Sequence, residues 1–130
     1  SSAASDVYKR QVVDDAVIAE LRKDAGDSLV QELIATYMAE TDDRLARMAS
    51  ALKDGRLEEV GADAHAMKSS SGTFGALRLE ALAAELEAAS TGNDRMRAVE
   101  LMEKLPSLVS ETWAGFTARG HVPRDREPNR

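Results

Sequence analysis

Apolar residues recur at intervals of three and four along most of the chain, the spacing that places them on one face of an α-helix. Glycine-containing breaks at Gly26, Asp54-Gly55, Gly75 and residues 90–93 divide this pattern into five segments. We predict helices from Asp14 to about Ala25, from Asp27 to Asp54, from about Leu57 to Gly75, across 79–89, and from about Asp94 through Phe116. No stretch shows the alternating pattern of a β-strand, so the expected fold class is all-α.

Short polar residues mark the ends of the first two helices. Asp14 is the predicted N-cap of the first helix, Gly26 is expected to close it with a positive φ, and Asp27 is the predicted N-cap of the second. Pro106 is expected to kink the last helix, because proline lacks the N–H that an internal turn requires. The second helix carries apolar residues at helical spacing, namely Leu29, Leu33, Ile34, Tyr37, Leu45, Met48 and Leu52. The residues expected to point inward from the fourth and fifth helices are Leu79, Leu82, Leu86, Ala89, Val99, Met102, Leu105, Val109, Trp113 and Phe116.

Helices joined by a few residues pack as antiparallel neighbours. We therefore predict an up-down antiparallel four-helix bundle, with the short extra N-terminal helix lying across one end. The bundle domain is expected to cover residues 12–119. Residues 1–11 are expected to be disordered or an expression artefact, and 120–130 a disordered tail in which His121 is incidental.

Composition narrows the functional classes. The net charge is −6 and no basic face is recognisable, so nucleic acid is not an expected partner. The acidic pairs Asp42-Asp43 and Glu58-Glu59 are expected to be solvated. The absence of cysteine excludes disulfides and thiolate zinc sites. No apolar run approaches the ~18 residues of a membrane span, and a cytoplasmic monomer without membrane contacts is the expectation.

His65 stands in a setting of small side chains on the third helix. A helical projection places it on one stripe with Lys68 and Ser69, continued by Gly61, Ala62, Gly72 and Ala76. The opposite, largely apolar face carries Val60, Ala64, Met67, Ser71 and Phe74. A glycine inside a helix costs about 1 kcal/mol relative to alanine. The glycines of this stripe therefore indicate close approach, either by another macromolecule or by a neighbouring helix.

These residues resemble the histidine-containing phosphotransfer (HPt) domain, whose pattern is His-x-x-Lys-Gly-(Ser/Ala)-(Ser/Ala), then Gly-Ala, a Leu, and a later Leu-Glu. The matching positions here are His65, Lys68, Ser69, Ser70, Ser71, Gly75-Ala76, Leu79 and Leu86-Glu87. Further matches upstream, from Val13-Asp14 to Asp54-Gly55, extend the resemblance over residues 12–118. Ser69 departs from the usual glycine, but a serine is small enough to leave His65 accessible.

The resemblance implies that His65 accepts a phosphoryl group from a receiver-domain aspartate or a kinase and passes it to another receiver domain. Lys68 would neutralise phosphoryl charge, and Gly61, Ala62, Ser69, Gly72 and Ala76 would contact the partner. No nucleotide-binding loop or acidic metal pocket is recognisable. The protein is therefore expected to be a phosphoryl carrier without cofactor or metal of its own, and Mg²⁺ is expected on the partner receiver domain.

Other readings of the same residues remain open. The chain could be the phosphorylatable module of a larger histidine kinase, although its length favours a free-standing intermediate, or a binding-only bundle that docks receiver domains. A single histidine without convergent carboxylates disfavours a metal-dependent hydrolase.

Overall fold

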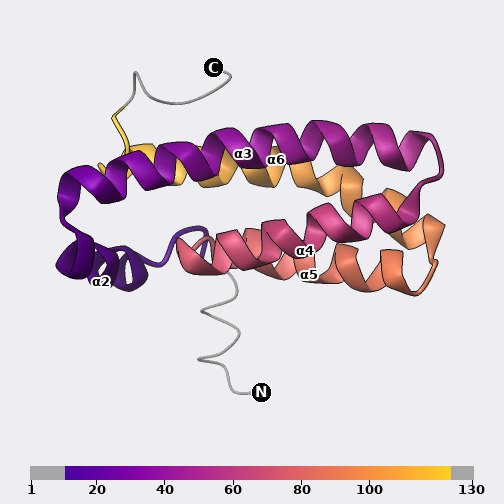
Figure 1. The fold of residues 1–130 in the computed structure, drawn as a ribbon, viewed down its shortest axis with the longest axis horizontal. Helices are drawn as coiled ribbons and strands as arrows, with labels where there is room; N and C mark the ends of the chain where they lie inside the picture. Colours follow the sequence, from indigo (N-terminus) through magenta and orange to yellow (C-terminus); the bar gives the residue numbers. More distant parts are fainter. Residues whose placement is uncertain (1–10, 124–130) are drawn as a thin grey trace.

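The computed structural model describes residues 11–123, and within this range it contains α-helices and no strand. The elements, labelled as in Figure 1, are α2 (Asp15–Ala25), α3 (Asp27–Lys53), α4 (Leu57–Thr73), α5 (Leu77–Thr91) and α6 (Arg95–Ala118). The all-helical class is confirmed, and each predicted helix is found within a few residues of its expected ends. The helix period and the breaks at glycine were therefore sufficient to locate the elements.

The capping residues of α2 and α3 agree with the sequence in part. The Asp14 side chain accepts a hydrogen bond from the Ala16 N–H at 3.0 Å, so its role as N-cap is confirmed. Gly26 has the predicted positive φ, at 90°, with ψ at 155°. The prediction for Asp27 is wrong, because Gly26 is itself the N-cap of α3 and Asp27 is its first helical residue. A carboxylate in that first turn still lies favourably in the field of the helix dipole.

The four long helices, α3 to α6, run along the long axis of the molecule, and α2 lies at one end beside the start of α3 (Figure 1). Each long helix contacts the next along the chain, and α6 also contacts α3. The turns between them are short, at residues 54–56, 74–76 and 92–94. Among the described helices, none combines the length and apolar character that crossing a membrane demands.

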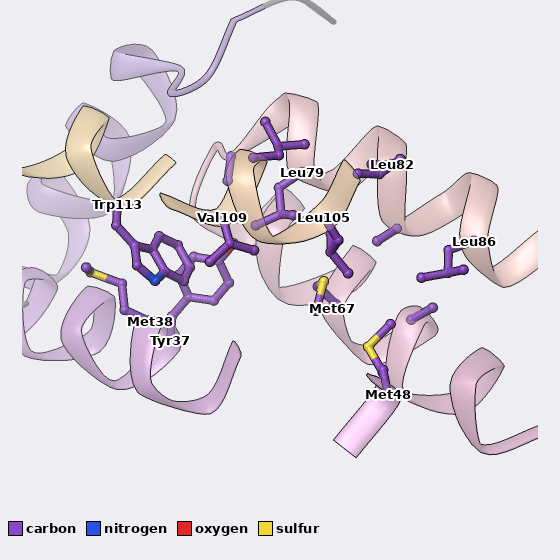
Figure 2. Packing of buried hydrophobic residues seen from close by; sticks show 14 of the residues in the cluster. Tyr37, Met38, Met48, Met67, Leu79, Leu82, Leu86, Leu105, Val109 and Trp113 are labelled. Carbon is purple, nitrogen blue, oxygen red and sulfur yellow. The ribbon is translucent and has the colours of Figure 1, made fainter. Parts of the chain in front are cut away.

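The core is a single cluster of apolar side chains to which every described helix contributes. Figure 2 shows part of this cluster, with labelled side chains from α3 to α6. Around Tyr37, aromatic rings meet edge to face, with centroids 5.4 Å from Trp113 and 6.3 Å from Phe116. The Trp113 indole N–H donates to Asp42 Oδ1 at 3.1 Å. Asp42 is therefore a core-edge acceptor and not only a solvated charge, which corrects the prediction for that residue.

Three apolar side chains of the predicted helical pattern are exposed, and one of them, Val99, was predicted to point inward. Leu29 is 51% exposed, Leu33 40% and Val99 37%. In α3 the buried positions include Val30 and Met38, which the sequence pattern did not single out. A helical repeat identifies an apolar stripe, but the exact centre of that stripe depends on where the neighbouring helices lie. The α6 helix continues through the exposed Pro106 without ending.

The predicted disorder of the tail from residue 120 onward is wrong for His121 and Val122, which are buried. Gly120 has φ 74°, and beyond it His121 is 5% exposed and Val122 1%. The His121 ring packs against Phe116, and its Nε2 lies 2.8 Å from Asp15 Oδ1 in α2. A reversal of direction at a glycine leaves no helical periodicity in the sequence, so these contacts could not be read from it.

The N-terminal boundary is also extended by one residue. The carbonyl of Gln11 accepts a hydrogen bond from the Arg78 N–H at 3.2 Å, so this residue is attached to the start of α5. Residues 1–10 and 124–130, the remainder of the two predicted disordered ends, lie outside the described residues.

Gly75 and Gly120 offer a matched pair for testing the turn between α4 and α5. Both have positive φ, at 71° and 74°, but a Cβ on Gly75 would lie 2.9 Å from the Asp14 carbonyl oxygen, whereas nothing lies within 4 Å at Gly120. We expect Gly120→Ala to lower the free energy of unfolding by about 1 kcal/mol through backbone strain, and Gly75→Ala by at least about 2 kcal/mol. Urea denaturation of both variants measures the difference. Equal losses would contradict the close backbone contact at Gly75.

Candidate functional site

His65 lies on the outer surface of α4, with 61% of its side chain exposed. The predicted exposure of this residue is therefore confirmed. Its Nδ1 atom lies 2.7 Å from Oε2 of Glu87, which α5 brings alongside α4. One ring nitrogen is thus engaged by the neighbouring helix, and the other, Nε2, takes no part in that contact.

Glu87 joins His65 to Lys68. Its second oxygen, Oε1, accepts a hydrogen bond from Lys68 Nζ at 2.7 Å, so one carboxylate holds both side chains of α4. The hydrogen bond from Lys68, followed by that from His65, lowers the pKa of Glu87 below its ordinary value despite partial burial.

The ionised carboxylate also determines the protonation pattern of the imidazole. A carboxylate can only accept hydrogen bonds, so in neutral His65 the proton lies on Nδ1 and points at Glu87. The lone pair is then on Nε2. This is the tautomer that a nucleophilic Nε2 requires.

Close packing of α4 on α5 brings these residues together. A Cβ on Gly61 would lie 3.2 Å from the Ser90 Cβ, and a Cβ on Gly72 would lie 2.7 Å from Glu80 Oε2. Both glycines therefore face α5. Of the two reasons that the sequence left open for them, close approach of a neighbouring helix is the one that the structure supports. Gly61 is also half-exposed at the edge of a surface hollow, so it remains available to a partner.

That hollow borders the exposed imidazole. It measures about 550 Å³ and is lined by Leu57, Glu58, Gly61, Ala62, His65, Glu87, Ser90 and Thr91. Ala62 and Ser69 are exposed as predicted. Ala76 is fully buried at the N-cap of α5, so its predicted contact with a partner is wrong. The chain leaves the α4 helix after Thr73, and the helical projection that placed Ala76 on the His65 stripe no longer applies there.

A buried hydrogen bond joins α4 to α3 on the core face of α4. Tyr37 and Ser71, both buried, lie with their hydroxyl oxygens 2.6 Å apart. Burial raises the pKa of the Tyr37 hydroxyl above its ordinary value, so it stays neutral and hydrogen-bonded. Ser71 is therefore a packing residue, and α4 is fixed to α3 through it as well as to α5 through Glu87.

The sequence pointed to His65 and Lys68 but assigned no role to Glu87. Its only signal was the Leu86-Glu87 pair within the resemblance, since a contact 22 residues away cannot be read from helical spacing. Among residues 11–123, no three histidine, aspartate or glutamate side chains gather in a way that could hold a metal ion.

The lowered pKa of Glu87 predicts a pH-dependent contribution to stability. Glu87 binds its proton more weakly in the folded state than in the unfolded state. The ionised Glu87 therefore stabilises the fold above the ordinary glutamate pKa of ~4.3, and this stabilisation is lost as the pH falls through the lower pKa of the folded state. We expect Glu87→Gln to cost at most about 1 kcal/mol near neutral pH, because the group is near the surface, and nothing at pH 2. Urea denaturation of both proteins at several pH values measures this; a difference that persists at pH 2 would contradict an ionic origin.

Comparisons with known proteins identify the family of this chain. The family model of the Hpt domain matches residues 32–115. The chain is 31% identical over 115 residues to the phosphorelay protein LuxU of Vibrio cholerae, covering 86% of this chain and 99% of that protein. It also resembles the crystal structure of histidine-containing phosphotransfer protein B (HptB) from Pseudomonas aeruginosa PAO1, with a TM-score of 0.79 and 25% identity, covering 93% of this chain and 99% of that one. The chain therefore belongs to the Hpt domain family.

Proposed function

We propose that His65 is the phosphoacceptor of this protein, taking a phosphoryl group from a receiver-domain aspartate or a kinase and passing it to another receiver domain. Membership of the Hpt family places the chain in histidine phosphotransfer within phosphorelays. The observation that carries the assignment to His65 is the Glu87 contact at Nδ1, which orients an exposed imidazole with its nucleophilic nitrogen free.

The transfer step follows from this tautomer. The Nε2 lone pair attacks the phosphorus of an aspartyl phosphate; the N–P bond forms, the P–O bond to the aspartate breaks, and its electron pair stays on the aspartate carboxylate. Nδ1 keeps its proton, so the phosphorylated ring is a cation, and the Glu87 carboxylate 2.7 Å away stabilises its charge. Onward transfer reverses the step, with neutral imidazole as the leaving group.

Lys68 supplies positive charge one helical turn from His65, where it is held by Glu87. An ammonium group has three donors, and the hydrogen bond to Glu87 uses one of them. The remaining donors are available to oxygens of a phosphoryl group one helical turn away. Lys68 thereby offsets the negative charge that the incoming group brings next to Glu87.

The partner in this proposal is a receiver domain. The aspartate and the Mg²⁺ that phosphoryl transfer requires belong, in this proposal, to the receiver domain, while this protein acts as a monomeric carrier without turnover of its own. The hollow beside His65 and the exposed Ala62 and Ser69 form the partner surface. A transient contact of modest area suits a protein that must release each partner.

The same proposal includes an up-down antiparallel four-helix bundle formed by α3 to α6. Its support is the short turns between consecutive helices, together with contacts of each helix with the next and of α6 with α3. In that arrangement the α4 surface carrying His65 is a rigid platform.

Incubation with a phosphorylated receiver domain, and separately with a small phosphoramidate, tests the phosphoacceptor proposal. We expect acid-labile, base-stable phosphate on the protein, located at His65 by mass spectrometry. If no donor labels the protein, His65 is not a phosphoacceptor, and a binding-only domain that docks receivers becomes the better description.

Removal of the Lys68 ammonium should affect transfer more than folding. We expect Lys68→Ala to slow phosphoryl transfer from the receiver about 10-fold, which is the effect of losing one charge-assisted hydrogen bond. The free energy of unfolding should change by less than ~1 kcal/mol. Rapid-quench kinetics with Lys68→Arg as the charge-preserving control measures the effect. Equal rates for the parent and Lys68→Ala would remove Lys68 from the mechanism.

A further inference from the structure

Four hydroxyl side chains follow His65 on α4, and three of them are occupied. Ser70 donates to the Ala66 carbonyl at 3.1 Å, Ser71 is bonded to Tyr37, and Thr73 donates to the Ser69 carbonyl at 3.1 Å. The hydroxyl of Ser69 itself has no hydrogen bond within residues 11–123. It is also exposed.

The unoccupied hydroxyl is close to the reacting histidine. Ser69 follows His65 by four positions, so their Cβ atoms are neighbours at about 5–6 Å on the helix surface. Helical side chains lean toward the N-terminus, which directs the Ser69 side chain over the turn that contains His65.

Ser69 and Lys68 flank the imidazole from different directions. Consecutive helical residues project about 100° apart. Lys68 is turned toward α5, where it meets Glu87. Ser69 therefore lies on the flank of His65 that faces away from Glu87, while Nδ1 is the ring nitrogen bonded on the Glu87 side.

We propose that the Ser69 hydroxyl donates a hydrogen bond to a phosphoryl oxygen on Nε2 of His65. This inference rests on the proposed function and adds a second phosphoryl-binding group to Lys68. Because the bond exists only in the phosphorylated state, it shifts the phosphorylation equilibrium toward this protein and slows loss of the group to water. It adds no charge, so it does not compete for Glu87.

The test measures the equilibrium of phosphoryl exchange between the protein and one phosphorylated receiver domain, together with the half-life of the isolated phosphoprotein. We expect Ser69→Ala to reduce the equilibrium constant about 3- to 10-fold, the range for one net hydrogen bond, and to shorten the half-life. Ser69→Thr, which keeps a hydroxyl, should remain within about 2-fold of the parent.

Ser70→Ala is the matched control, since it removes the adjacent hydroxyl, which is bonded to its own helix. It should leave the equilibrium and the half-life unchanged. Thermal melts identify any variant whose change comes from unfolding, and alanine at these helical positions should not destabilise the fold.

The outcomes separate this inference from the proposed function. If the parent accepts phosphate at His65 but Ser69→Ala matches it in equilibrium and half-life, the Ser69 contact is wrong while the phosphoacceptor proposal stands. If Ser70→Ala lowers the equilibrium as much as Ser69→Ala, the effect is not specific to Ser69. A parent that accepts no phosphate from any donor contradicts both proposals.

Discussion

Replacement of His65 by glutamine is expected to abolish phosphate acceptance while leaving the fold intact. The variant loses the nucleophilic Nε2, and glutamine has no comparable nucleophile, so no acid-labile, base-stable phosphate should form with any donor. The side chain is 61% exposed and lies outside the core, so the free energy of unfolding should change by no more than about 0.5 kcal/mol. Labelling and thermal melts of the same preparation measure both effects.

The second histidine is a natural control for this experiment. His121 is buried against Phe116 and paired with Asp15, so His121→Gln should keep the phosphate label but lose about 1–2 kcal/mol of stability. The two variants thus have opposite expected profiles. Label remaining on His65→Gln would move the acceptor to another residue, and a large loss of stability in His65→Gln would contradict its surface position.

Truncation of Trp113 is expected to cause the largest loss of stability among single substitutions. The indole is 2% exposed and packs against Tyr37 and Phe116, and its N–H is bonded to Asp42. Trp113→Ala should cost about 3–5 kcal/mol, since it leaves a cavity and removes the indole N–H that donates to Asp42. For a domain of this size the melting temperature should fall by roughly 10–25 °C.

Two further variants separate the sources of that loss. Trp113→Phe keeps most of the ring contacts but loses the N–H donor, so it should cost clearly less than the alanine variant. Met96→Ala, at a side chain that is 82% exposed, should leave stability within about 0.5 kcal/mol of the parent. A cost below ~1 kcal/mol for Trp113→Ala, measured by calorimetry, would contradict the central packing of this ring.

The helical elements and the exposed histidine could be predicted because both depend on local rules. The apolar repeat and the glycine breaks located α2 to α6, and the stripe of small residues placed His65 on the surface of its helix. The Asp14 cap followed from the same kind of local chemistry. Each of these features depends on residues within one or two helical turns.

Other features depend on which helices become neighbours. Leu29 and Leu33 belong to an apolar repeat, yet the positions of the adjacent helices leave them exposed and bury Val30. Ala76 leaves the His65 stripe because the chain turns into α5, and His121 returns to α2 after the turn at Gly120. No spacing rule within one segment contains this information.

The same distinction applies to the site. The sequence by itself determined an exposed histidine with a lysine one turn away, because 3.6 residues per turn places positions i and i+3 side by side. Only the tertiary structure decided that Glu87 meets both, at 2.7 Å each, and so assigns the Nδ1 proton and the free Nε2. The physical reason is that this contact arises from the close packing of α4 on α5, which joins residues about 20 positions apart.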